Sequence, residues 1–474
     1  MFTFIQSVLL LASFVGIFGG LAYLISWLTT KNLSFSKAQF LLANRKLGFL
    51  ESSFSISATW IWAPALFVSA FQAYTNGWLG LFWFLVPNVL CLLLFSVFAT
   101  KIKSQFPEGY TLSEFMGIKH STRVQKMYWI TLIGLTVCAF AVQLLAGGQL
   151  LVNLTGIPYF WATVILAAIP LTYSLAFGLK ASVITDFVKM AMILGIGIFL
   201  IPMAISAGGG IDTVLAGLGG VKQNWDFFSE KSWLLFLTFG LPTTIGLISG
   251  PFGDQSFWQR AFATREDTVK RSFVAAAFLF GIVPLCMGAL GFLAAGSGIA
   301  IKNPAMVNLE TVSHYLGLGG VVVLFMLVMS ALTSIIDSKL CSVSSIVGHD
   351  VAEKYNLGFL NSAKGSMLLL TAIAISIANI PDLKILHLFL FYGTLRSATL
   401  VPTVLTLLEK RVNEAGIFYG ILVAVLVGLP IFAYGNFNAN PTWIVIGSLT
   451  TVLTPLIALV RRQAPVAQLV DAQR

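Results

Sequence analysis

Long apolar runs separated by short polar stretches dominate the chain. Thirteen runs approach the twenty or so residues that an α-helix needs to cross about 30 Å of hydrocarbon. They cover residues 5–29, 50–75, 78–99, 127–152, 158–176, 183–205, 232–250, 272–298, 319–345, 366–380, 385–408, 415–434 and 442–460. We therefore predict an all-α polytopic membrane protein with about 13 transmembrane helices.

Two of the runs are interrupted in ways that a simple membrane anchor does not need. The run at 50–75 contains "SISATWIWAPALF", with Pro64 in mid-span, and the run at 232–250 leads into "FGLPTTIGLISGPFG". Proline removes an amide donor and glycine loosens the backbone, so both stretches are expected to expose backbone polar groups at membrane depth. The two stretches are five runs apart, as expected for two inverted five-helix repeats. Alternatively, Pro and Gly are simply common in membrane helices.

Composition and charge agree with this architecture. Hydrophobic residues make up 57% of the chain, charged residues make up 10%, and the mean hydropathy is +0.90, which excludes a water-soluble domain of this length. An orientation with the N-terminus outside and the C-terminus inside places most loop Lys and Arg residues inside, as the positive-inside rule requires. It leaves outside only Lys222, Lys231, Lys302 and Lys384. The net charge of +10 thus reflects topology, and nucleic-acid binding is not indicated.

The chain is expected to form a single membrane domain over residues 1–474. Within it we predict an extra N-terminal helix at 5–29, a first repeat at 50–205, an inverted second repeat at 232–408 and two C-terminal helices at 415–460. The run at 5–29 lacks a basic n-region and is too long for a signal peptide, so we expect a retained helix. The four cysteines lie within predicted helices and indicate neither a disulfide framework nor a clustered metal site.

Four short stretches resemble the sodium:solute symporter family, in family order over about residues 40–410. They are "FLLANRKLGFLESSFSISATW" at 40–60, "GLKASVITDFVKM" at 178–190, "DQSFWQRAFATRE" at 254–266 and "SALTSIIDSKLCSVSSIVGHDV" at 330–351. The resemblance implies a LeuT-like inverted-repeat fold and alternating access around a midplane site. It also implies a sodium-coupled symporter of the cytoplasmic membrane that imports a small organic solute such as an amino acid, a carboxylate or a sugar. The expected partners are this solute and the lipid bilayer, and Na⁺ is the expected coupling ion.

The resemblance implies a sodium ion bound between the first and eighth core helices. The implied carbonyl ligands are Ala58 and Ile61 on the first helix and Ala331 on the eighth. Oxygen ligands suit a hard cation. The family's hydroxyl pair falls at Ser334 and Ile335, but the Ile335 side chain cannot coordinate an ion. Either one ligand is missing, or the register shifts by one and the pair is Thr333 and Ser334.

Some family members hold a second sodium nearer the cytoplasm, and the implied ligands here are Ser334, Asp337, Ser338 and Asp186. Two carboxylates that lie close together repel each other unless a cation or a proton separates them. We hypothesise that Asp186 and Asp337 form a cation-release site that offsets the hydroxyl missing at Ile335. The alternative is a buried ion pair of Asp337 with Lys339, Lys189 or Arg396 that has no transport role. Lys339 is expected to extend its ammonium group to the membrane interface.

Aromatic and polar side chains near the interruptions are candidates for a solute site, because such cavities combine apolar walls with a few polar groups. The candidates are Trp60, Trp62, Gln72, Gln143, Thr243, Thr244 and Arg396. Aromatic clusters also arise from core packing or lipid contact. A mid-membrane arginine costs roughly 2.5 to 3.5 kcal/mol on insertion scales, so Arg396 should face a partner. A solute partner would favour a carboxylate substrate, whereas Asp337 or Asp186 as the partner would say nothing about the solute.

Two other functions remain open at this stage. A proton-coupled or uncoupled carrier is compatible with Ile335 and with the two acids. A membrane sensor domain is disfavoured because no soluble output domain accompanies the predicted helices. No nucleotide-binding or catalytic motif is present, so we expect neither a primary pump nor an enzyme.

Overall fold

The computed structural model describes residues 3–31, 36–383 and 385–459, and these ranges are almost entirely helical. The first half of the chain forms α1 (Phe4–Phe14), α2 (Ala22–Thr30), α3 (Lys37–Leu42), α4 (Phe49–Trp60), α5 (Ala63–Gln105), α6 (Leu112–Lys119), α7 (Thr122–Thr155) and α8 (Tyr159–Ala207). The second half forms α9 (Ile211–Ala216), α10 (Glu230–Leu235), α11 (Leu241–Ile248), α12 (Gln255–Ala263), α13 (Val269–Ser297), α14 (Val307–Ser345), α15 (Ala352–Lys354), α16 (Phe359–Ala378), α17 (Ile385–Leu407), α18 (Glu414–Val423), α19 (Leu429–Phe437) and α20 (Pro441–Leu453). Lys384 and residues 460–474, whose side of the membrane was predicted above, lie outside the described ranges.

Twelve helical stretches among the described residues are long and apolar enough to cross a membrane. The predicted run at 50–75 is not one of them, because the chain leaves the helical path between α4 and α5 at Ile61 and Trp62. The rest of that run continues into the 43-residue stretch of α5. The all-α polytopic class predicted from the hydrophobic pattern is therefore confirmed.

Glycines turn the chain inside two of the longest helices. Gly77 in α5 has φ 68° and ψ −155°, and Gly178 in α8 has φ 63° and ψ −148°. Residues with a side chain rarely adopt this backbone conformation. A Cβ atom at Gly77 would also lie 2.4 Å from the Leu218 carbonyl oxygen, and one at Gly178 would lie 2.3 Å from that of Phe40. These turns coincide with gaps between the predicted runs.

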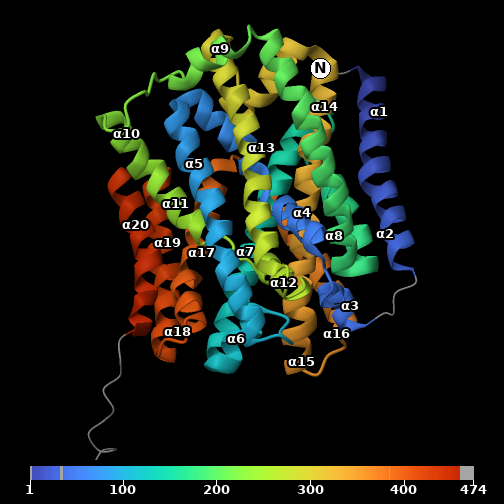
Figure 1. The fold of residues 1–474 in the computed structure, drawn as a ribbon, viewed down its shortest axis with the longest axis vertical. Helices are drawn as coiled ribbons and strands as arrows, with labels where there is room; N and C mark the ends of the chain where they lie inside the picture. The colour runs from blue at the N-terminus through green and yellow to red at the C-terminus, as the bar shows by residue number, and fades with distance from the viewer. Residues whose placement is uncertain (1–2, 32–35, 384, 460–474) are drawn as a thin grey trace, which may run out of the picture.

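The helices are arranged as a central bundle with additional helices on both edges (Figure 1). In the bundle, α13 packs along α5 and α14 packs along α8. The α1 and α2 helices lie against α7 and α8 at one edge, and α18 to α20 lie beside α17 at the other. The bundle between these edges contains both interrupted helices.

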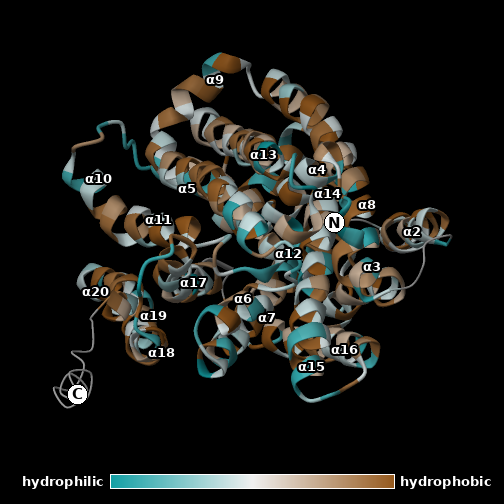
Figure 2. Cartoon of the chain, turned by 60° about the horizontal axis from the view of Figure 1, so that its bottom comes forward, coloured by the Kyte–Doolittle hydropathy of each residue, from teal (hydrophilic) through white to brown (hydrophobic). Residues whose placement is uncertain are grey.

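The hydropathy of the surface fits a lipid environment. Large apolar side chains are exposed on the outward faces of α8 and α13, for example Phe199 at 70%, Ile198 at 66% and Phe278 at 62%. Hydrophilic residues gather instead around α6 and in the loop between α15 and α16 (Figure 2). Exposed apolar area on this scale marks a surface that contacts lipid rather than water.

Candidate functional site

The first interruption separates α4 from α5 and is held open by a side chain from α7. Ile61 leaves helical geometry with φ −82° and ψ 75°, and Pro64 lies in the first turn of α5. The break removes the intrahelical partner of the Ala63 amide, which donates instead to Oε1 of Gln143 at 2.9 Å. Gln143 is fully buried and its Nε2 donates to the Ala139 carbonyl. Gln143 therefore stabilises the break itself.

Replacing Gln143 with Leu is expected to lower the free energy of unfolding by about 1 to 3 kcal/mol, because the buried Ala63 amide loses its acceptor. The fall should appear as a lower thermal midpoint of the purified protein in detergent. Gln149→Leu, six positions further along α7, is the matched control and should have the smaller effect. Equal midpoints for the two variants would contradict this role of Gln143.

The second interruption separates α11 from α12 over residues 249–254. Asp254 ends it by accepting a hydrogen bond at Oδ1 from the Ser256 amide at 3.0 Å. Backbone atoms approach other groups closely here. A Cβ atom at Gly250 would lie 2.3 Å from the Trp60 ring, and one at Gly253 would lie 3.2 Å from Arg396. The two interruptions and α17 thus meet in one buried region, and the breaks predicted from Pro64 and from the glycine-rich stretch are confirmed.

Asp186 on α8 lies in a fully buried network of polar groups. Its Oδ2 atom accepts from Arg260 Nη2 at 2.9 Å and from Ser55 Oγ at 2.6 Å, and its Oδ1 accepts from the Ser334 hydroxyl. Arg260 also donates to Ser338 Oγ at 2.7 Å and to Ser55 Oγ at 2.9 Å. The network joins α4, α8, α12 and α14.

Asp337 on α14 has a different basic partner. Its Oδ2 lies 2.7 Å from Nζ of Lys189 and accepts from the Tyr173 hydroxyl at 2.6 Å, while its Oδ1 accepts from Ser182 Oγ at 2.6 Å. Asp337 is fully buried and Lys189 is 3% exposed. Of the three basic residues considered as partners from the sequence, the structure places Lys189 beside Asp337.

The expectation that Lys339 extends its ammonium group to the membrane interface is wrong. Lys339 is 2% exposed, and its Nζ donates to Oδ2 of Asp254 and to Ser256 Oγ at 3.0 Å. The helical path of α14 continues through a π-helical turn to Lys354, so Lys339 lies well inside this helical stretch. Arg396 Nη2 approaches the same Asp254 carboxylate at 3.8 Å. Asp254 therefore contacts two buried cations.

The residues implied as sodium ligands lie close to these networks. Ala58, Ala331 and Ser334 are fully buried, as is Ser338, and Ile61 is the residue at the break. The Ser334 hydroxyl donates to Asp186, whereas the alternative ligand Thr333 donates to Met329 of its own helix at 2.7 Å. Ile335 is buried and offers no side-chain oxygen. Three carbonyls and one hydroxyl are thus the oxygen groups that this pattern provides.

The residues predicted for the solute separate into two places. Arg396 lies among aromatic rings, with its guanidinium carbon 3.7 Å from the Tyr392 ring centroid, 5.0 Å from that of Trp62 and 5.2 Å from that of Trp60. Trp60 is otherwise a packing residue whose Nε1 donates to the Asn88 carbonyl at 3.2 Å. Gln72 lies farther along α5 and lines a separate cavity.

Several buried polar groups in the central region make no hydrogen bond within the described chain. They are Nε1 of Trp62, Nε and Nη1 of Arg396, and the hydroxyls of Thr243 and Thr244 on α11, which packs against α17. Buried polar groups in native proteins are usually paired, and unpaired ones require an explanation. A small solute with hydrogen-bonding groups would satisfy them.

Membrane-length helices with two discontinuous members that meet around buried polar residues define the chain as a secondary transporter, not an enzyme. A model of the sodium:solute symporter family matches residues 40–424. The chain belongs to this family.

Curated relatives include transporters named for urea and symporters named for sodium. The urea-proton symporter DUR3 of Oryza sativa subsp. japonica is 24% identical over 84% of this chain. The sodium/pantothenate symporter of Escherichia coli (strain K12) is 25% identical over 83% of this chain and 85% of its own length. The chain spans only 61% of the length of the rice relative. A solute symporter is therefore the common element.

Solved structures confirm the LeuT-like fold. The structure of a Na⁺-coupled sialic acid symporter in a substrate-bound outward-open state matches with a TM-score of 0.76. It is 16% identical, and the match covers 96% of this chain and 98% of that one. MhsT in complex with L-phenylalanine matches with a TM-score of 0.52 at 14% identity, over 86% of this chain and 97% of that one.

Proposed function

We propose that this symporter imports a small uncharged solute of the urea or amide class together with protons, by alternating access around the two helix breaks. The observation that carries the proposal is the pairing of Asp337 with Lys189 and of Asp186 with Arg260. Both carboxylates that were candidates to hold a transported cation are already paired with a positively charged side chain of the protein itself.

Coordination favours a proton over a sodium ion at these carboxylates. A sodium ion needs several oxygen ligands, but both Asp337 oxygens are already bonded, to Lys189 Nζ at 2.7 Å and to the hydroxyls of Tyr173 and Ser182 at 2.6 Å. A proton carries the same charge but needs only one carboxylate oxygen. Its binding to Asp337 weakens the attraction of this carboxylate to Lys189, which changes how α8 is held to α14.

The solute class rests on the unpaired groups and on the relatives. Trp62 Nε1 and two nitrogens of Arg396 offer donors for a carbonyl oxygen, and the Thr243 and Thr244 hydroxyls can donate or accept. Arg396 has Asp254 as an acidic neighbour, a partner that the sequence did not suggest, so a solute carboxylate is not needed to balance it. A relative named as a urea-proton symporter supports the same class.

Sodium coupling is the second candidate, and it also has a specific observation in its favour. The carbonyls of Ala58 and Ile61 lie at the break, and α4 packs against α14, which carries the fully buried Ala331 and Ser334. Oxygen ligands of this kind suit a hard monovalent ion. The E. coli relative named as a sodium symporter supports this alternative.

Uptake into proteoliposomes tests the coupling ion. An inside-alkaline gradient of one pH unit is worth about 1.4 kcal/mol per proton, so it should drive roughly tenfold accumulation of radiolabelled urea or acetamide. A sodium gradient at equal pH on both sides is the comparison and is expected to give equilibration only. Accumulation that follows the sodium gradient and ignores the pH gradient would contradict proton coupling.

The proposal includes an orientation and a division of the chain. Residues 50–205 and 232–408 form the two inverted repeats, 5–29 and 415–460 are the additional helices, and the N-terminus is outside the plasma membrane. Ser55, which bonds to Asp186, and Lys37, which pairs with Glu353, then belong to the cytoplasmic half. These contacts close that half, while a cavity of about 720 Å³ lies on the opposite side beneath residues 222–231.

A further inference from the structure

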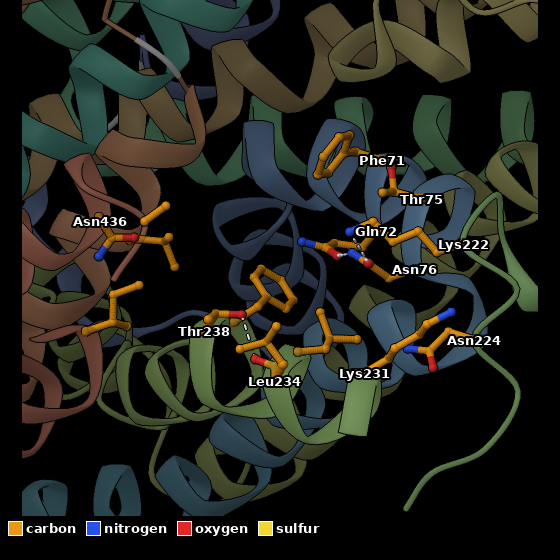
Figure 3. Close-up of a pocket in the computed structure, with 15 residues that line it drawn as sticks. Phe71, Gln72, Thr75, Asn76, Lys222, Asn224, Lys231, Leu234, Thr238 and Asn436 are labelled. Carbon is orange, nitrogen blue, oxygen red and sulfur yellow. Dashed lines mark hydrogen bonds between the residues drawn. The ribbon is translucent and has the colours of Figure 1, made fainter. Parts of the chain in front are cut away.

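The cavity on the outer side has walls of defined polarity (Figure 3). Its volume is about 720 Å³ and its polar lining includes Gln72, Asn76, Lys222, Lys231, Thr238 and Asn436. The roof is fixed to α5, because the amides of Val221 and Lys222 donate to the carbonyls of Tyr74 at 2.8 Å and Thr75 at 3.2 Å. These backbone hydrogen bonds therefore position the Lys222 side chain next to Asn76.

Lys222 fixes the orientation of the Asn76 side-chain amide, and Asn76 in turn fixes that of Gln72. Its Nζ can only donate, and it donates to Oδ1 of Asn76 at 3.1 Å. Asn76 must then turn its Nδ2 away from the lysine, and this group donates to Oε1 of Gln72 at 2.5 Å. The oxygens of both amides are thereby occupied, which leaves Gln72 Nε2 as the free end of the chain of hydrogen bonds. Gln72 and Asn76 are 3% and 6% exposed, so neither is a loose surface group.

The opposite wall offers hydrogen-bond acceptors, because its donor groups are used in hydrogen bonds to backbone carbonyls. Asn436 Nδ2 donates to the Phe432 carbonyl at 3.0 Å, so its Oδ1 is the free end. The Thr238 hydroxyl donates to the Leu234 carbonyl at 2.8 Å and keeps its lone pairs available. Figure 3 shows Asn436 across the cavity from Gln72 and Asn76. Asp226 and Glu230 lie in the same loop region but do not line the cavity.

We propose that this cavity is an outer binding site for a small uncharged amide or ureido solute, with its carbonyl oxygen toward Lys222 and Gln72 and its N–H groups toward Asn436 and Thr238. Lys222 and Lys231 would attract a carboxylate, but a carboxylate offers no N–H group to Asn436 and Thr238, and both lysines would repel an organic cation. The solute class and the outer location rest on the proposed function. The site itself is distinct from the central region at Trp62 and Arg396.

Protection of an introduced cysteine tests this site without measuring transport. In proteoliposomes, Thr75→Cys, which lines the same cavity but is not among the proposed solute contacts, is labelled from outside with a neutral methanethiosulfonate, against a background in which the four native cysteines are replaced. Acetamide is expected to slow labelling severalfold, whereas its charged counterparts acetate and methylammonium leave the rate within about 1.5-fold. Absence of protection by acetamide, or protection by acetate alone, would overturn the proposal.

Asn76→Asp tests the chain of hydrogen bonds specifically. The new carboxylate accepts from both Lys222 and Gln72 Nε2, so Gln72 turns its oxygen to the cavity and protection by acetamide is expected to be lost. Labelling without solute should stay normal, which shows that the cavity is intact. Lys302→Met is the matched control, since Lys302 lines another cavity, and it should keep protection. Full protection in Asn76→Asp would overturn the proposal, whereas failure of pH-driven uptake with protection retained would count only against proton coupling.

Discussion

Replacing Arg260 with Met is expected to lower the free energy of unfolding by about 3 to 5 kcal/mol, the range found when one partner of a buried ion pair is removed. Arg260 and Asp186 are both fully buried, so the carboxylate left behind has no water to replace the guanidinium. Ser55 and Ser338 also lose their bonds to Arg260, which joins α12 to α4 and α14. The measurement is the thermal midpoint of the purified protein. It is obtained from the loss of the monodisperse peak in size-exclusion chromatography after heating to a series of temperatures.

A control variant and a double variant test whether the loss of stability comes from an unpaired buried charge. Arg265→Met removes a pair with Asp267 whose side chains are 58% and 59% exposed, so it should change stability by no more than about 1 kcal/mol. The double variant Asp186→Asn with Arg260→Met should recover part of the loss, because no unpaired charge remains. A double variant less stable than Arg260→Met alone would show that the cost is not that of an unpaired carboxylate.

Features encoded by local backbone chemistry could be predicted from the sequence. The break at Ile61 follows from Pro64, which cannot donate an amide hydrogen bond, and the break at 249–254 follows from its glycines. The gaps between predicted runs at Gly77 and Gly178 likewise correspond to backbone turns that favour glycine. Each of these signals is contained within a few neighbouring residues.

The partners of the buried charges could not be predicted in the same way. Arg260 and Asp186 are 74 positions apart, and Lys339 and Asp254 are 85 positions apart, so their pairing depends on which helix faces which. Asp254 was missed because a carboxylate beside glycines looks like an ordinary loop residue. Arg260 lay within a recognised motif, but nothing local indicated that it is fully buried. Tyr173 gave no signal at all.

The mistake about Lys339 has a similar origin. An apolar run that ends near a lysine usually indicates a side chain that reaches the interface. The predicted run ends at residue 345, six positions after Lys339, but the helical path continues through Ile346–Val351, whose buried residues include His349 and Asp350. Polar residues that are buried by protein lower the hydropathy of a segment without ending it, so hydropathy alone places the end too early.

Replacing Asp337 with Asn is expected to remove pH-driven accumulation almost completely. Under a gradient of one pH unit, the ratio of internal to external urea should fall from roughly ten to about one, because the amide cannot take up the proton. Counterflow of labelled against unlabelled urea needs no net proton movement and should persist. Asp267→Asn, an exposed carboxylate in the loop after α12, is the control and should keep the full ratio.

The same experiment separates a coupling role from the ion pair without transport role that the sequence left open. The double variant Lys189→Met with Asp337→Asn removes both charges, so a purely structural pair would be replaced at little cost. If Asp337 carries the proton, this double variant still exchanges urea but does not accumulate it. If the pair of Asp337 and Lys189 only holds α8 against α14, accumulation returns with stability, and the coupling proton must bind elsewhere. The comparison works because Tyr173 and Ser182, which also bond to Asp337, remain available to an amide oxygen.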